Sequence, residues 1–126
     1  MTDRPDTNPK SAFGIQKPPM HLVPGPALVQ TAMVFGLGAK KYGPYNWRDH
    51  SVAASVYVAA AQRHLSSWFD GEAIDPESGQ PHLAHAVACC MILLDAMANG
   101  MLVDDRPKPG VTAQMIADIA KAAKPT

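Results

Sequence analysis

The sequence predicts an all-α fold: a compact bundle of about three to four helices, preceded by an extended N-terminal arm. Three observations support this class. Apolar residues recur at helical spacing in several segments, no segment alternates like a strand, and glycine or proline separates the segments. A chain of 126 residues with 47% apolar residues is also long enough for one domain with a buried core.

The chain divides into three parts. Residues 1–16 are polar and proline-containing, so we expect a flexible arm. Residues 17–104 carry the helical patterns and are expected to form an all-α catalytic domain. Residues 105–126 read as a linker and a short amphipathic helix capped by Thr112, which would pack on the bundle or on a second subunit.

Three helices are expected within the central part. The first starts at Pro26 and weakens at Gly36 and Gly38. The second runs from about Val52 to Phe69, with Ser51 as its cap and many alanines for close packing. The third runs from near Pro81 to Asn99-Gly100. Its expected core stripe is Leu83, Val87, Cys90, Leu94 and Met97.

Charge and hydropathy exclude several classes of function. The formal net charge is zero and the pI is about 7.0, which argues against a nucleic-acid or anionic-membrane surface. The longest apolar run is too short to span a bilayer, and the N-terminus lacks the apolar segment of a secretory signal. The adjacent Cys89 and Cys90 are poor disulfide partners for each other, so a cytoplasmic location is expected.

The connector between the second and third helices, residues 71–85, concentrates acids and imidazoles. Glu72 and Asp75 are three residues apart, and His82 and His85 are three apart at the start of the third helix. Such oxygen and nitrogen donors can build a divalent metal site. The alternative is that the acids are solvated surface groups or helix caps, and that the histidines are surface or core residues with their hydrogen bonds made.

A second polar segment, residues 40–48, mixes lysines, aromatics, an amide and an arginine around the turn Gly43-Pro44. It reads either as a solvated loop or as a ligand loop, in which aromatics stack on bases and cations meet phosphates. Arg63 and His64 lie in the C-terminal half of the second helix, where cations stabilise a helix through its macrodipole. Alternatively, their side chains point at the acidic connector.

Taken together, these motifs resemble a known family. The residues that carry the likeness are Gly38-Ala39-Lys40-Lys41-Tyr42-Gly43, Asn46-Trp47-Arg48, Ala61-Gln62-Arg63-His64-Leu65, Trp68, Gly71-Glu72, Asp75, Glu77-Ser78-Gly79 and His82-Leu83-Ala84-His85-Ala86. The ordered series, within residues 17–100, resembles the dATP/dGTP diphosphohydrolase family of the N-terminal domain type, found largely in phages.

The resemblance implies a fold akin to the all-α MazG-like nucleoside triphosphate pyrophosphohydrolases. Those enzymes cleave the α–β phosphoanhydride and release a monophosphate and pyrophosphate, using divalent metal held by acidic residues on helices. The MazG-like pattern places ExxE on one helix and ExxD on the next. This chain has Glu72-x-x-Asp75 and then His82-x-x-His85.

The function expected is metal-dependent hydrolysis of a purine deoxynucleoside triphosphate, dGTP or dATP, in the cytoplasm of the host cell if the chain is phage-encoded. The expected cofactor is Mg²⁺ or Mn²⁺, with Co²⁺ as a further option because imidazoles favour it. The expected metal ligands and catalytic groups are Glu72, Asp75, His82 and His85. The expected substrate-binding residues are Lys40, Lys41, Tyr42, Asn46, Trp47, Arg48, Arg63 and His64.

Two rival functions stay open. One is a nucleotide-binding or oligomerisation module without turnover. Under either function we expect a homo-oligomer, because short helices around a polar site leave apolar faces that another subunit can cover. The other is a His/Asp phosphohydrolase, which ranks last because Asp49-His50 runs in the reverse order to the required dipeptide.

Overall fold

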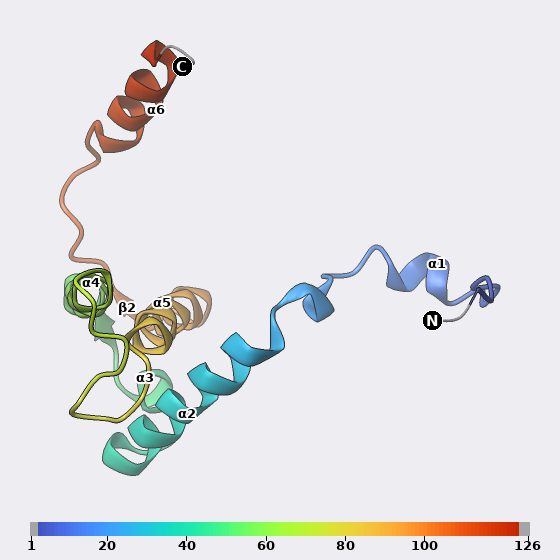
Figure 1. Ribbon diagram of the computed structural model, residues 1–126, viewed down its shortest axis with the longest axis horizontal. Helices are drawn as coiled ribbons and strands as arrows, with labels where there is room; N and C mark the ends of the chain where they lie inside the picture. Colours follow the sequence, from blue (N-terminus) through green and yellow to red (C-terminus); the bar gives the residue numbers. More distant parts are fainter. Residues whose placement is uncertain (1–2, 124–126) are drawn as a thin grey trace.

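The computed structural model describes residues 3–123 as a helical bundle with two extensions (Figure 1). The all-α class, the bundle and the extended arm are confirmed. The elements are α1 (Ser11–Gly14), the 3-10 turn η1 (Met20–Leu22), α2 (Gly25–Tyr42), α3 (Asn46–Asp49), β1 (Val52–Ala53), α4 (Ala54–Phe69), α5 (His82–Ala98), β2 (Leu102–Val103) and α6 (Thr112–Ala122).

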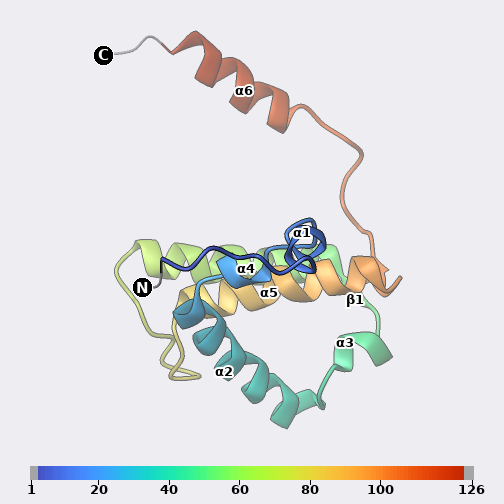
Figure 2. The ribbon, with the colours of Figure 1, turned by 90° about the vertical axis from the view of Figure 1, so that its right-hand side faces the viewer.

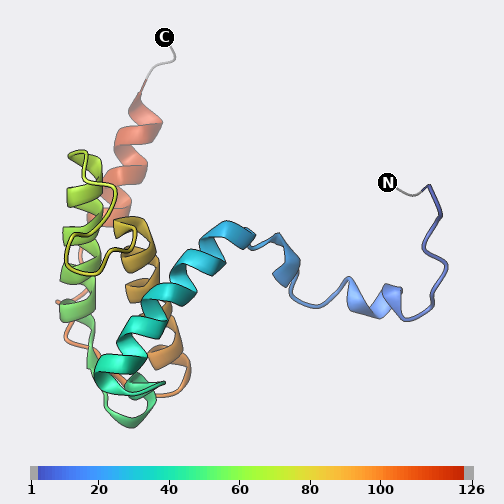
Figure 3. The ribbon, with the colours of Figure 1, turned by 60° about the horizontal axis from the view of Figure 1, so that its bottom comes forward.

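The bundle is built on α4 and α5, which lie side by side and make the most extensive helix–helix contact (Figure 2). Helix α2 packs across α5 at a steeper angle (Figure 3). The residues buried between the helices are mostly small, which lets the backbones approach closely. The buried apolar residues are Val52, Ala54, Ala61, Ala84, Ala86, Ala88 and Ala96.

The helix bounds follow the sequence signals closely, with one exception at the end of the first helix. α2 continues through Gly36 and Gly38 to Tyr42 and ends at Gly43, whose φ of 89° suits a residue without a side chain. α5 ends where the Asn99-Gly100 signal predicts, with Gly100 at φ 70°.

Both predicted side-chain caps are wrong. Ser51 does not cap the second helix, because residues 52–53 are extended and pair in parallel with β2 before α4 begins. Thr112 does not cap α6 either; it is the first helical residue and makes no capping hydrogen bond. The short parallel ladder was not predicted, since two residues are too few to show an alternating pattern.

The predicted core stripe of α5 is also wrong for the single chain. Leu83, Val87, Leu94 and Met97 are 38%, 42%, 68% and 55% exposed, and Cys90 is exposed as well. Alanines of α5 occupy the interface with α4 instead. The large apolar side chains of α5 therefore form an open face.

The two extensions stand away from the bundle. The arm with α1 and η1 leads off one end of α2, and α6 lies at the far end of the 104–111 segment (Figures 1 and 3). Every residue of α6 is exposed, so packing of α6 on the bundle is not observed. Among residues 3–123, no helix combines the length and apolarity that crossing a membrane requires.

Candidate metal and nucleotide site

The connector between α4 and α5 is a tight loop rather than a helical turn. Ile74 forms an antiparallel bridge with Pro81, and the Asp75 amide donates to the Gln80 carbonyl at 2.9 Å. Gly79, at φ 74°, donates its amide to the Asp75 carbonyl at 2.8 Å. These bonds close the loop over the start of α5 and turn the Asp75 side chain toward the bundle.

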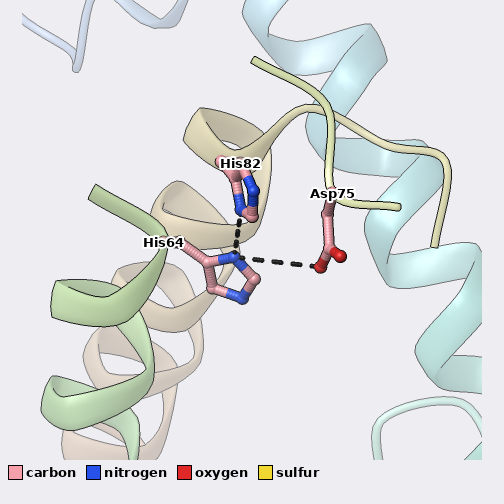
Figure 4. Close-up of side chains that lie close together, drawn as sticks. All are labelled: His64, Asp75 and His82. Atoms are coloured by element: carbon pink, nitrogen blue, oxygen red, sulfur yellow. Dashed lines mark hydrogen bonds and ion pairs between the residues drawn. The ribbon is translucent and has the colours of Figure 1, made fainter. Parts of the chain in front are cut away.

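Three side chains from separate elements meet at this point (Figure 4). His64 comes from α4, Asp75 from the connector and His82 from the first turn of α5. The two Nδ1 atoms lie 2.9 Å apart, and His64 Nδ1 lies 4.0 Å from Asp75 Oδ2. One ligand atom from each residue lies within 4.8 Å of the other two. Two imidazole nitrogens and a carboxylate oxygen are ligand types that can hold a divalent cation.

Glu72 contacts His82 on the side of the ring that faces away from His64. Its Oε1 lies 2.6 Å from His82 Nε2. A carboxylate can only accept, so Nε2 of His82 must carry the hydrogen. In the neutral ring, Nδ1 then carries a lone pair and accepts a hydrogen bond from His64 Nδ1 at 2.9 Å. A carboxylate that orients a histidine in this way is the usual outer partner of a metal-bound imidazole.

His85 lies one turn along α5 and completes the imidazole group. Its ring stacks on that of His64, with centroids 4.5 Å apart and planes 6° apart. Its Nε2 lies 2.6 Å from Ser78 Oγ and 3.7 Å from Asp75 Oδ2. His85 is thus held by a hydroxyl and sits beside the carboxylate rather than among the three clustered donors.

Partial burial favours the neutral form of two of these imidazoles. Desolvation is the main cause that lowers the pKa of His64, and the neighbouring His85 and His82 lower it further. Desolvation also lowers the pKa of His85, partly offset by the Asp75 carboxylate. Neutral imidazoles are the form that binds metal or accepts a proton.

The cluster lines a polar pocket of about 480 Å³. Lys41 and Arg63 also line it, so two cations share the pocket with the imidazoles and with the carboxylates of Asp75 and Glu77. The full lining is Lys41, Tyr42, Arg63, His64, Ser67, Asp75, Glu77, Ser78, His82 and His85. Lys40 does not line this pocket.

The remaining candidates from residues 40–48 lie elsewhere. Asn46 and Trp47 line a smaller, mostly apolar hollow next to the polar pocket. Arg48 pairs with Asp95 through two hydrogen bonds of 2.9 and 2.8 Å. The indole Nε1 of Trp47 donates to the same carboxylate at 2.8 Å.

Several residues at these sites were not among the predicted site residues, and three of them matter most for the geometry. Ser67 lines the pocket, Ser78 holds His85, and Asp95 fixes Trp47 and Arg48. The Ser78-Gly79 turn was a readable signal for a bend beside the histidines. Asp95 gave no local signal, because its partners lie 47 and 48 residues earlier in the chain.

Comparison with known proteins assigns the chain to a family. The family model described as dATP/dGTP diphosphohydrolase, N-terminal, matches residues 7–106. The chain belongs to this family. The resemblance inferred from residues 17–100 is therefore confirmed.

A protein of Salmonella phage PMBT28 described as a dATP/dGTP diphosphohydrolase is 29% identical over 106 residues. The match covers 81% of this chain and 36% of the phage protein. The chain therefore spans little more than a third of that relative's length. No solved structure matches the chain.

Proposed function

We propose that this domain hydrolyses purine deoxynucleoside triphosphates, dGTP or dATP, to the monophosphate and pyrophosphate with the aid of a divalent metal. One observation carries the proposal: two imidazole nitrogens and one carboxylate converge within 4.8 Å in a pocket that also holds Lys41 and Arg63. Membership of the family and the name of the phage relative agree with it.

The donor set fits a divalent cation. His64, Asp75 and His82 would hold it, since their ligand atoms already face one another and Glu72 fixes the His82 tautomer. Two imidazoles and one carboxylate suit Mn²⁺ or Co²⁺ better than Mg²⁺, which prefers oxygen ligands. When bound, the metal neutralises triphosphate charge and lowers the pKa of a coordinated water.

The other residues of the pocket have complementary roles. Hydrolysis forms a bond from water oxygen to the α-phosphorus and breaks the bond to the bridging α–β oxygen, so the water loses a proton and pyrophosphate leaves. Desolvation lowers the pKa of His85 and so favours its neutral form, and Ser78 holds the ring, so His85 can accept that proton. Lys41 and Arg63 can counter the phosphate charge.

Product analysis tests the proposal. The full chain is incubated with dGTP or dATP and Mn²⁺, Co²⁺ or Mg²⁺, and products are separated by ion-exchange chromatography. We expect equal amounts of monophosphate and pyrophosphate, and a loss of about 100-fold or more in Asp75→Asn. Asp118→Asn, on the exposed α6, is the matched control and should keep full activity. Unchanged turnover in Asp75→Asn would overturn the assignment.

A binding module without turnover is the second candidate, because the chain spans only 36% of its phage relative. Thermal stabilisation by dNTP with metal, without any product, would support it. Stabilisation accompanied by pyrophosphate release would support hydrolysis instead.

A further inference from the structure

A second hollow adjoins the polar pocket between α2 and α5. It measures about 170 Å³ and shares Tyr42 and His85 with the polar pocket. Elsewhere its walls are largely apolar and aromatic, with Phe35 and Trp47 on the side of α2 and α3 and Ala88 on α5. A ligand that occupies both spaces would meet charged and polar groups at one end and apolar, aromatic walls at the other.

The aromatic wall of this hollow is held in place. Trp47 donates its Nε1 hydrogen to Asp95 at 2.8 Å, and its ring packs on Phe35 with centroids 5.4 Å apart and on Tyr45 with centroids 5.7 Å apart. Arg48 donates two further hydrogen bonds to the same Asp95 carboxylate. Asp95 thus joins α3 to α5 and fixes the orientation of the indole before any ligand arrives.

Asn46 and Tyr57 are polar residues that line this hollow. The side-chain amide of Asn46 makes no hydrogen bond to another residue in the range 3–123, although Asn46 is half-buried against the aromatic wall. An amide presents one acceptor and two donors side by side. That pattern matches the adjacent donor and acceptor on the edge of a nucleobase.

We propose that this hollow is the nucleobase slot, in which Trp47 forms the stacking wall, Asn46 reads the edge of the base and Asp95 is a positioning residue that holds Trp47. This deepens the proposed function and depends on the triphosphate lying in the polar pocket. The polar pocket of about 480 Å³ and the slot of about 170 Å³ together reach the size of a small-molecule site, roughly 300–1,000 Å³.

Tryptophan fluorescence tests the slot directly. The chain has two tryptophans, so Trp68→Phe leaves Trp47 as the single reporter. We expect dGTP and dATP, with Mn²⁺, to change Trp47 emission because the base stacks on the indole. Pyrophosphate with Mn²⁺ carries no base and should leave the emission unchanged while still raising the melting temperature.

Two sets of variants assign the roles. Asn46→Ala should weaken dGTP or dATP binding by about tenfold or more, and the near-isosteric Asn46→Asp should reorder the preference among the four dNTPs. Neither should alter pyrophosphate binding. Asp95→Ala should raise KM with kcat little changed, and Asp95→Asn should restore part of the loss because its amide oxygen still accepts from Trp47.

The outcomes separate the slot from the hydrolysis. Base-dependent emission without any product would support the slot and overturn turnover. Hydrolysis would be supported and the slot contradicted by product formation without any change in Trp47 emission. Product formation together with unchanged dNTP affinity in Asn46→Ala would have the same meaning. An equal loss of pyrophosphate binding in Asn46→Ala would mean general damage to the fold and would also overturn the assigned role.

Discussion

At the scale of single residues, the pair Glu72 and His82 determines what the cluster can bind. His82 is buried, whereas the Glu72 side chain is 53% exposed. The short bond between them places the ring hydrogen on Nε2, so Nδ1, which lies 2.9 Å from His64 Nδ1, carries the lone pair that could bind a cation. The acid predicted from sequence as a metal ligand therefore reaches the proposed metal through the histidine that it orients.

Glu72→Gln tests this role because it keeps the shape and removes the charge. We expect affinity for Mn²⁺ or Co²⁺ to fall about 10- to 100-fold, as for other outer-shell carboxylates. Isothermal titration with each metal measures it. Glu77→Gln is the matched control, since Glu77 lines the same pocket without touching His82. Equal metal affinity in wild type and Glu72→Gln would contradict the role.

The two partly buried imidazoles, His64 and His85, make stability depend on pH. The folded state lowers the pKa of His64 and His85 below the ordinary value of about 6.5, so folding favours their neutral forms. Their contribution is complete above pH 6.5 and is lost as the pH falls through the lowered values. We expect the metal-free protein to lose urea stability between pH 7 and pH 5.

The double variant His64→Asn/His85→Asn is the control for this loss of urea stability between pH 7 and pH 5. It should show a smaller fall in the urea midpoint over the same range. Asp95 and Asp104, whose pKa values lie near 2 because of their arginine partners, stay ionised there and do not produce the effect. A fall of equal size in the variant would mean that other groups are responsible.

At the scale of elements, α4 is held at its start by a distant residue. The Ser55 amide, in the first turn of α4, donates to Asp105 Oδ1 at 2.8 Å, and the Ser55 hydroxyl donates to Asp105 Oδ2. Asp105 thus supplies the acceptor that Ser51 was expected to supply, and its negative charge faces the positive end of the helix. It also ties the segment after β2 to the bundle.

Asp105→Asn should therefore lower the urea midpoint, because it removes the charge at the start of α4 and weakens the two bonds. Asp104→Asn is the control: Asp104 pairs only locally with Arg106 in the described chain. We expect the Asp104 variant to match wild type within error. The reverse order of stability would show that Asp105 does not anchor α4.

The elements that the sequence predicted well are those with local signals. Asn99-Gly100 marks the end of a helix and Gly43-Pro44 marks a turn, because their backbone preferences act over one or two residues. The cap from Asp105, the β1–β2 pairing and the Asp95 contacts depend on residues about 50 positions apart. No local pattern encodes those distances, so they emerge only from the packed chain.

The same distinction applies to the candidate site. Asp75, His82 and His85 could be read from one short segment. The part played by His64 depends on where α4 lies against α5, and the separate position of Arg48 depends on Asp95. Residue types therefore indicated the chemistry, while the packing of helices decided which of those residues meet.

At the scale of the whole molecule, the chain leaves an unusual amount of surface open. Its accessible area is 10404 Å², whereas a compact monomer of this mass has about 6,500 Å². The arm and α6 account for part of the excess, and the open face of α5 for another part. A standard interface buries only about 800 Å² per partner, so the excess is ample for one or more interfaces.

We expect the chain to form a homo-oligomer that covers the α5 face, because no large apolar side chain in the described residues is fully buried. Light scattering after size exclusion should give a mass above 13.4 kDa. Leu94, 68% exposed in the single chain, is the most open member of the face, so Leu94→Glu should shift the mass toward the monomer. Gln62→Glu adds the same charge at an exposed polar position of α4 and should not. A monomeric wild type, or an unshifted Leu94→Glu, would mean that this face stays open in solution.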